Sequence, residues 1–141
     1  MQALVLEGKE DFQMREVEKP ACPQDGLLVK VDSVGLCGSD VRTYFHGHHH
    51  IEYPVILGHE NVGEIVEVGE EVENFVVGDR IIVNPVLPCN QCWYCKKGWQ
   101  HMCSDRLTYG HHIQGGFAEY MAGPGIGLAR GQGLTVAGGA R

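Results

Sequence analysis

The sequence predicts a mainly β fold, a small barrel or sandwich with short helices. Three observations lead to this prediction. Short stretches are rich in valine and isoleucine, glycine-containing turns separate them, and the clearest helix signal is confined to one short segment. With 141 residues, the chain is also long enough to bury a core without help.

Four stretches carry the strand prediction. Within 27–31, Leu27, Val29 and Val31 are spaced as the inner side of a half-buried strand. Stretches 61–68 and 80–83 are rich in Val and Ile and are bounded by turns that contain glycine. Residues 116–121 are expected to form a further strand.

The clearest helix prediction covers residues 40–45. Ser39 precedes this segment and is a residue type that caps the first amides of a helix. Cys37 then lies just ahead of the helix, where the positive end of the macrodipole favours a thiolate.

Composition and charge exclude several classes of function. The formal net charge of -7 leaves no basic surface to neutralise phosphates, so we expect no nucleic-acid partner. The N-terminal segment lacks the basic stretch and apolar run of a signal peptide, and no segment approaches the length of a membrane span. We therefore expect a cytoplasmic protein without a membrane partner, in a compartment where clustered cysteines bind metal more often than they form disulfides.

Four cysteines within a short segment indicate a metal site. Their spacing is C-x2-C-x2-C-x7-C, and two-residue gaps let a tight turn aim neighbouring sulfurs at one point. A shell filled by four thiolates has no open position for substrate, so such a zinc site is structural. Disulfides and an iron–sulfur cluster are the alternatives. The predicted ligands are Cys89, Cys92, Cys95 and Cys103.

A second group of potential ligands lies earlier in the chain. Cys37, His59 and Glu60 are all zinc-ligand types, and an incomplete protein shell is what a catalytic zinc needs. Spacing alone is weak evidence here, because the cysteine and the histidine are 22 residues apart. The segment that begins with His59 is not H-E-x-x-H, which excludes a zincin protease.

Four longer motifs follow one another along the chain. They read GLCGSDVRTY, YPVILGHENVGEIVEVGEEVENFVVGDR, PCNQCWYCKKGWQHMC and GGFAEY. With these motifs, the chain resembles the zinc-dependent medium-chain alcohol and polyol dehydrogenases, with the sorbitol and threonine dehydrogenase branches nearest. The resemblance covers residues 1 to about 121, and the motifs stand in the family's order. The implied fold is a GroES-like β-barrel with short helices and a four-cysteine zinc-binding lobe.

The resemblance also assigns roles to the residues around Cys37. Cys37 and His59 would bind the catalytic zinc, and Glu60 would be a further ligand or lie beside it. Ser39 would pass the proton of the substrate hydroxyl outward, and Asp40 would orient the ring of His59. The reaction would be the oxidation of a secondary alcohol or polyol by hydride transfer to NAD(P), with zinc as the Lewis acid.

Two features depart from the family pattern. The usual relay histidine, five residues after the zinc cysteine, is Arg42, which cannot release a proton near pH 7. We interpret 1–122 as the zinc-binding catalytic domain and 123–141, which contains seven glycines, as the remnant of a truncated or deleted Rossmann cofactor domain. NAD(P) is therefore not expected to bind here, and the chain is expected to be inactive by itself.

Other readings stay open. A zinc-stabilised binding or assembly module would need only the lobe zinc, and a homo-oligomer is compatible with either function. Ser39 is as readily a helix cap, and Asp40 a first-turn acid that faces the helix dipole. The histidines at 46 and 48–50 form either an adventitious metal site or, as we favour, a solvated loop near the cleft, and His111 and His112 are interpreted in the same way.

Overall fold

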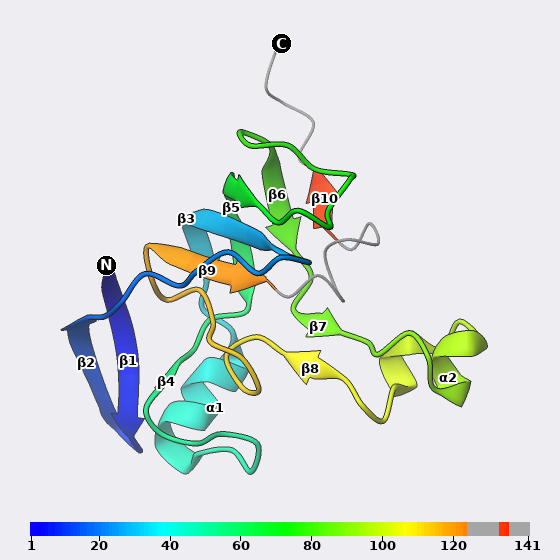
Figure 1. Cartoon of the computed structure of the whole chain (residues 1–141). Helices are drawn as coiled ribbons and strands as arrows, with labels where there is room; N and C mark the ends of the chain where they lie inside the picture. Colours follow the sequence, from blue (N-terminus) through cyan, green and yellow to red (C-terminus); the bar gives the residue numbers. More distant parts are fainter. Residues whose placement is uncertain (124–132, 136–141) are drawn as a thin grey trace.

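The computed structural model describes residues 1–123 and 133–135, and it is mainly β (Figure 1). Its larger sheet has five antiparallel strands in the order β10-β6-β5-β3-β9. These strands are β3 (Leu27–Gly35), β5 (Glu60–Val68), β6 (Arg80–Val83), β9 (Tyr120–Gly123) and β10 (Gly133–Thr135).

A second, smaller sheet is also antiparallel. Its order is β2-β1-β4, formed by β1 (Gln2–Gly8), β2 (Asp11–Glu16) and β4 (Val55–Ile56). The segment before β9 links the two sheets, because the carbonyl of Phe117 accepts a hydrogen bond from the Leu4 amide and the Glu119 amide donates to Gln2.

The remaining elements are short. β7 (Val86–Leu87) and β8 (Leu107–Thr108) form a two-stranded ribbon that leads out to α2 (Trp93–Lys96) and the 3-10 helix η1 (Gln100–Met102). Figure 1 shows this lobe projecting away from both sheets, while α1 (Gly38–His46) lies near β4. No helix among the described residues is long and apolar enough to cross a membrane.

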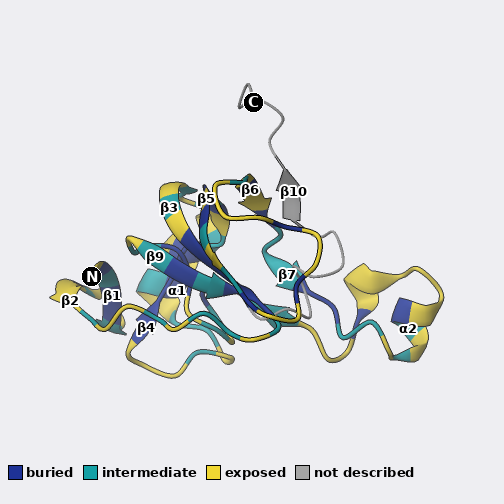
Figure 2. Cartoon of the chain, turned by 45° about the horizontal axis from the view of Figure 1, so that its top comes forward, coloured by how far each residue is buried: buried dark blue, intermediate teal, exposed yellow. Residues whose placement is uncertain are grey.

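Burial concentrates in the middle of the larger sheet (Figure 2). Leu27, Val29, Ile65 and Ile81 are at most 1% exposed and belong to one cluster that also contains Tyr109. Because β-branched and leucine side chains fill the inner face of β3, β5 and β6, the sheet is a rigid base for the segments that leave its ends.

The mainly β prediction is confirmed, and three of the four predicted strands appear at about their predicted positions. The fourth is wrong in its bounds: 116–121 contributes only its last residues to β9, because Gly116 and Phe117 bond instead to the backbone of Leu57 and Gly58. The helix is longer than predicted and begins at Gly38, with Cys37 as its N-cap rather than Ser39.

The glycine-rich end of the chain lies mostly outside the described residues. Of it, Gly133–Thr135 pairs through its backbone with β6. The division at residue 122 therefore stays a prediction.

Candidate metal centres

Strand pairing brings Cys37 and His59 together. β3 and β5 are antiparallel neighbours, and Gly35 at the end of β3 faces Glu60 at the start of β5. Cys37 follows β3 as the N-cap of α1, and His59 directly precedes β5. Ligands that are distant in sequence thus emerge at the same edge of the sheet.

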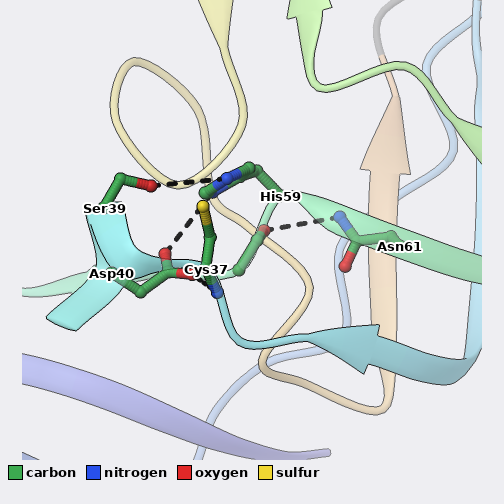
Figure 3. Close-up of polar contacts among 6 residues, drawn as sticks. Cys37, Ser39, Asp40, His59 and Asn61 are labelled. Atoms are coloured by element: carbon green, nitrogen blue, oxygen red, sulfur yellow. Dashed lines mark hydrogen bonds and ion pairs between the residues drawn. The ribbon is translucent and has the colours of Figure 1, made fainter.

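The donor atoms of Cys37, His59 and Glu60 all lie within 4.8 Å of one another. Cys37 and His59 are partly buried, whereas Glu60 is exposed. Figure 3 shows the Cys37 and His59 side chains converging from the start of α1 and the turn before β5. The three potential ligands are therefore covered by protein at Cys37 and His59 and open to solvent at Glu60.

Asp40 connects the first two of these residues. Its carboxylate is 1% exposed, and Oδ2 accepts a hydrogen bond of 2.9 Å from the Cys37 amide. Oδ1 faces His59 Nδ1 at 3.4 Å, and neither of these two buried atoms has a hydrogen-bond partner among the described residues. Since a carboxylate oxygen only accepts, this approach favours the proton of neutral His59 on Nδ1, which leaves the Nε2 lone pair free.

Ser39 lies on the Nε2 side of the same ring. Its Oγ is 3.5 Å from His59 Nε2, and Ser39 is half-buried in the first turn of α1 (Figure 3). The hydroxyl is therefore next to the nitrogen that Asp40 leaves available for a ligand.

Two glycines fix the backbone around His59. Gly58 has φ of 91°, and a Cβ there would lie 2.7 Å from the ring of Phe117, so only glycine fits without strain. The carbonyl of Gly58 also accepts a hydrogen bond of 3.4 Å from the buried Asn61 amide. At Gly35, a Cβ would overlap the carboxylate of Glu60, so the absence of a side chain makes room for that potential ligand.

These residues fit a zinc ion. Catalytic zinc takes three protein ligands of N, S or O type and keeps one position open, and Cys37, His59 and Glu60 supply one donor of each type. The Asp40 carboxylate, whose Oδ1 lies 3.4 Å from the buried Nδ1 of His59, stands where zinc-binding histidines usually have an outer partner. The donor set is therefore that of an open zinc site.

The second group lies in the projecting lobe. Cys89 Sγ is 3.5 Å from Cys103 Sγ and 4.0 Å from Cys95 Sγ, and Cys92 Sγ is 3.9 Å from Cys103 Sγ. A tetrahedral site with Zn–S bonds of about 2.3 Å has edges of about 3.8 Å between sulfurs. All four cysteines are free, so the disulfide alternative does not describe this lobe, and the spacing matches a closed four-thiolate site.

Ionisation of the four thiols is uneven. Hydrogen bonds, first from the backbone at Cys95 and then from neighbouring thiols, lower the pKa of Cys92 to about 6. Burial, followed by hydrogen bonds with the thiols of Cys92, Cys103 and Cys89, raises the pKa of Cys95 to about 12. Four like charges cannot gather at these distances without a cation, and a divalent metal favours the thiolate at every position.

The other candidates lie around these groups. Arg42, at the position of the family's relay histidine, is exposed on α1. Cys22 is free and lies apart from both metal groups. The histidines after α1 do not stand alone, because the rings of His48 and His111 stack with centroids 4.3 Å apart. Sequence spacing contains no signal for that tertiary contact.

The structure combines a mainly β domain with two groups of potential metal ligands, one closed and one open. This combination indicates a zinc-binding domain, and comparison with known proteins identifies its family. Residues 23–130 match the alcohol dehydrogenase GroES-like domain. The match spans most of the chain, so the chain belongs to this family, and the predicted family and GroES-like fold are confirmed.

Individual proteins support the same assignment. A sorbitol dehydrogenase of Bombyx mori is 39% identical over 104 residues, 72% of this chain and 30% of that protein. The crystal structure of galactitol-1-phosphate dehydrogenase from Escherichia coli is 35% identical with a TM-score of 0.87. A short chain alcohol dehydrogenase from E. coli CFT073, complexed with the cofactor NADH, is 34% identical with a TM-score of 0.83. Each structural match covers 96% of this chain but 38% of the other, so the chain spans about a third of the length of its relatives.

Proposed function

We propose that this chain is the catalytic domain of a zinc-dependent oxidoreductase that oxidises a secondary alcohol or polyol by hydride transfer to NAD(P). The observation that carries the proposal is the convergence of Cys37, His59 and Glu60 on one open group. A domain stabilised only by the cysteine lobe has no need of a second, incomplete ligand set.

The proposed metal ligands are Cys37, His59 and Glu60 at the open site, and the four cysteines at the lobe. Zinc, when bound at the open site, would act as a Lewis acid that makes a substrate hydroxyl easier to deprotonate. Glu60 is the exposed member, so it is the ligand best able to move aside when substrate enters.

Asp40 acts as a positioning residue. One oxygen holds the Cys37 amide and the other faces His59 Nδ1, so a single buried carboxylate sets the geometry of both ligands. Because Asp40 directs Nδ1 toward itself, Nε2 is presented to the open side of the site.

Ser39 is the proton acceptor in this proposal. Its Oγ lies 3.5 Å from His59 Nε2, where it can receive the hydroxyl proton of a bound alcohol and pass it to water. In the overall reaction the carbon loses its hydride to NAD(P)⁺, and the hydroxyl oxygen loses its proton along this route. Arg42 has no part in it, because a guanidinium does not release a proton near pH 7.

We propose no NAD(P)-binding site within this chain. The relative with NADH is covered over 38% of its length, and the family match corresponds to the GroES-like domain. We therefore propose that this chain binds zinc and alcohol but does not turn over by itself. With NAD or NADP and a panel of polyols, it should show no oxidation above background.

The alternative is a zinc-stabilised binding or assembly module. It is favoured by exposed apolar side chains on the lobe, where Trp93, Trp99 and Met102 are each at least half exposed. Cobalt substitution separates the two functions, since cobalt reports each ligand set by its absorption bands.

The test adds sorbitol to the cobalt-loaded chain. We expect the bands of the open site to shift while those of the four-thiolate lobe do not, and we expect the shift to vanish in Cys37→Ala with one cobalt fewer per chain. Retention of both ions and of the shift in Cys37→Ala would contradict the proposed ligands, and a wild-type chain without any shift would favour the module.

A further inference from the structure

The outer strand of the smaller sheet has a long free edge. In the order β2-β1-β4, β2 (Asp11–Glu16) pairs with β1 on one side, and Figures 1 and 2 show β2 at the margin of the molecule. β2 has six residues, whereas the other edge strands of the described part of the chain have two to four. All but one of its residues are exposed. β2 therefore offers the longest sheet edge among the described residues.

Hydrogen bonds at the base of the hairpin determine which backbone groups of β2 face outward. The Met1 amine donates to the Val17 carbonyl at 2.7 Å, and the Val17 amide donates to the Met1 carbonyl at 2.8 Å. These two residues are thus a hydrogen-bonded pair, and such pairs alternate with non-hydrogen-bonded ones along an antiparallel ladder. In the register of β1 and β2, Gln13 therefore bonds to β1, whereas Phe12 and Met14 turn their amides and carbonyls outward.

β2 lacks the features that usually block such an edge. Edge strands are commonly protected by lysine, proline or a bulge. β2 contains neither lysine nor proline, and the bulge of the hairpin lies on β1, between Leu6 and Gly8. No described residue forms a hydrogen bond with the outward backbone groups of Phe12 and Met14. The edge is therefore a regular template for one more antiparallel strand.

An identical strand fits this edge in one favoured register. Outward backbone groups must meet outward groups, so a two-fold axis has to pass through a residue, and Gln13 and Met14 are the two in the middle of β2. With the axis at Gln13, Phe12 of each copy faces Met14 of the other, and each such pair exchanges both backbone hydrogen bonds. With the axis at Met14, Phe12 would instead face the carboxylate of Glu16. The sequence therefore favours the axis at Gln13.

The apolar side chains of β2 support this register. Phe12 and Met14 lie on one face of the strand, because side chains alternate between the two faces. The Phe12 ring stacks on Tyr44 with centroids 5.3 Å apart, whereas Met14 is 64% exposed. Opposite Phe12 of a second copy, Met14 would be covered by an aromatic ring, and such cross-strand pairs stabilise a sheet.

The charges on the other face of β2 also match. Asp11 would lie opposite Arg15 of the second copy, once on each side of the axis. Arg15 also pairs with Glu7 of its own chain at 2.9 Å, and the five donors of a guanidinium can hold both carboxylates. Glu10, with φ of 60°, turns out of the strand, so it does not extend the pairing toward Glu16 of the second copy. The edge is thus complementary in charge to itself.

We propose that two copies of this chain associate by pairing β2 with β2 across a two-fold axis at Gln13, which joins their three-stranded sheets into one continuous antiparallel sheet. β2 contributes to neither group of potential metal ligands, so the inference is independent of the proposed function. The paired stretch, 11–15, forms a small contact, and we expect a reversible dimer with a Kd of about 10 to 100 µM.

Sedimentation equilibrium of the whole zinc-loaded chain, from about 1 µM to about 1 mM, measures the dimer directly. Asp11→Lys puts a cation opposite Arg15 on both sides of the axis, so the dimer Kd should rise at least about 10-fold. Adding Arg15→Glu reverses the pair and should bring the Kd back to within about 3-fold of that of the unaltered chain. The matched control Glu7→Gln removes only the ion pair within the chain, so its Kd should stay unchanged.

Two results would overturn the proposal. A chain that stays monomeric at about 1 mM would do so, and it would leave a strand of another protein as the occupant of the edge. An Asp11→Lys chain that dimerises as tightly as the unaltered chain would show that the copies meet through a different surface. Zinc content, measured on every variant, confirms that the domain remains folded.

Cross-linking tests the register. The two copies of Gln13 form a non-hydrogen-bonded pair on the axis, where Cα atoms are about 4.5 Å apart and within reach of a disulfide. In a zinc-loaded Cys22→Ser background, Gln13→Cys should therefore oxidise to a covalent dimer at concentrations above the Kd. Glu16→Cys should not, because its two copies would lie about 20 Å apart. A Gln13→Cys chain without the cross-link, or equal cross-linking of both variants, would overturn the axis at Gln13.

Discussion

The four-cysteine lobe and the Cys37 site place similar donor atoms in opposite settings. The lobe draws its ligands from one segment of fifteen residues, 89–103, and Cys95 and Cys103 are buried. The Cys37 site draws its ligands from the ends of two paired strands and leaves Glu60 exposed. Local sequence is therefore sufficient to build a closed structural site, whereas an open site depends on the tertiary register of the sheet.

Breaking the lobe should have the largest effect. Cys95→Ser replaces a buried thiolate ligand, so the lobe should lose its zinc and the chain more than about 2 kcal/mol of unfolding free energy, as expected when a structural metal is lost. Zinc analysis and chemical denaturation measure both changes. Cys22→Ser is the matched control, because Cys22 is free and outside both groups. Unchanged zinc content in Cys95→Ser would show that the lobe is not a four-thiolate site.

Replacing the buried carboxylate of Asp40 should weaken zinc binding at the open site. In Asp40→Asn, the amide oxygen can still accept from the Cys37 amide, but the amide nitrogen then faces His59 Nδ1 as a donor. The proton of His59 is forced to Nε2, where it blocks metal binding. We expect zinc affinity at this site to fall about 10- to 100-fold while the lobe zinc is retained.

The measurement is a competition titration with a zinc-binding dye. Asp32→Asn serves as the control, because Asp32 forms a surface ion pair with Arg80 at 2.7 Å and belongs to neither group of potential metal ligands. If Asp40→Asn bound zinc as tightly as the unaltered chain, Asp40 would be only an acid at the helix start.

The same contrast explains what could be predicted from sequence. The lobe ligands follow from spacing alone, because two-residue gaps fit a tight turn. By contrast, Cys37 and His59 are linked by the pairing of Gly35 with Glu60, which no local pattern encodes. Their assignment therefore depended on resemblance to a family. The stacking of His48 on His111 could not be predicted, because neither local spacing nor the resemblance to the family links the two segments.

Local rules also misplaced element boundaries. Ser39 is a good cap by residue type, yet the helix begins earlier because Asp40 accepts the Cys37 amide and makes Cys37 the N-cap. Strands β1 and β2 gave little sign of their pairing, since β2 is almost wholly exposed and its turn contains Glu10 at φ of 60° rather than a glycine. Residues 116–119 carry a strand-like composition but cross between the two sheets.

Ser39 separates a structural role from a functional one, and its replacement should have the smallest effect. If Ser39 were the cap, Ser39→Ala would cost about 1 kcal/mol of stability. Because Ser39 lies inside the first turn and Cys37 is the cap, we expect a change below about 0.5 kcal/mol and unchanged zinc content. The hydroxyl near His59 Nε2 should instead contribute to alcohol binding, so the sorbitol concentration needed for the cobalt shift should rise about 2- to 10-fold. The control is Ser33→Ala at an exposed position of β3, which should change neither the stability nor the sorbitol concentration needed for the cobalt shift. A destabilised Ser39→Ala chain with normal sorbitol affinity would show that Ser39 has only a structural role.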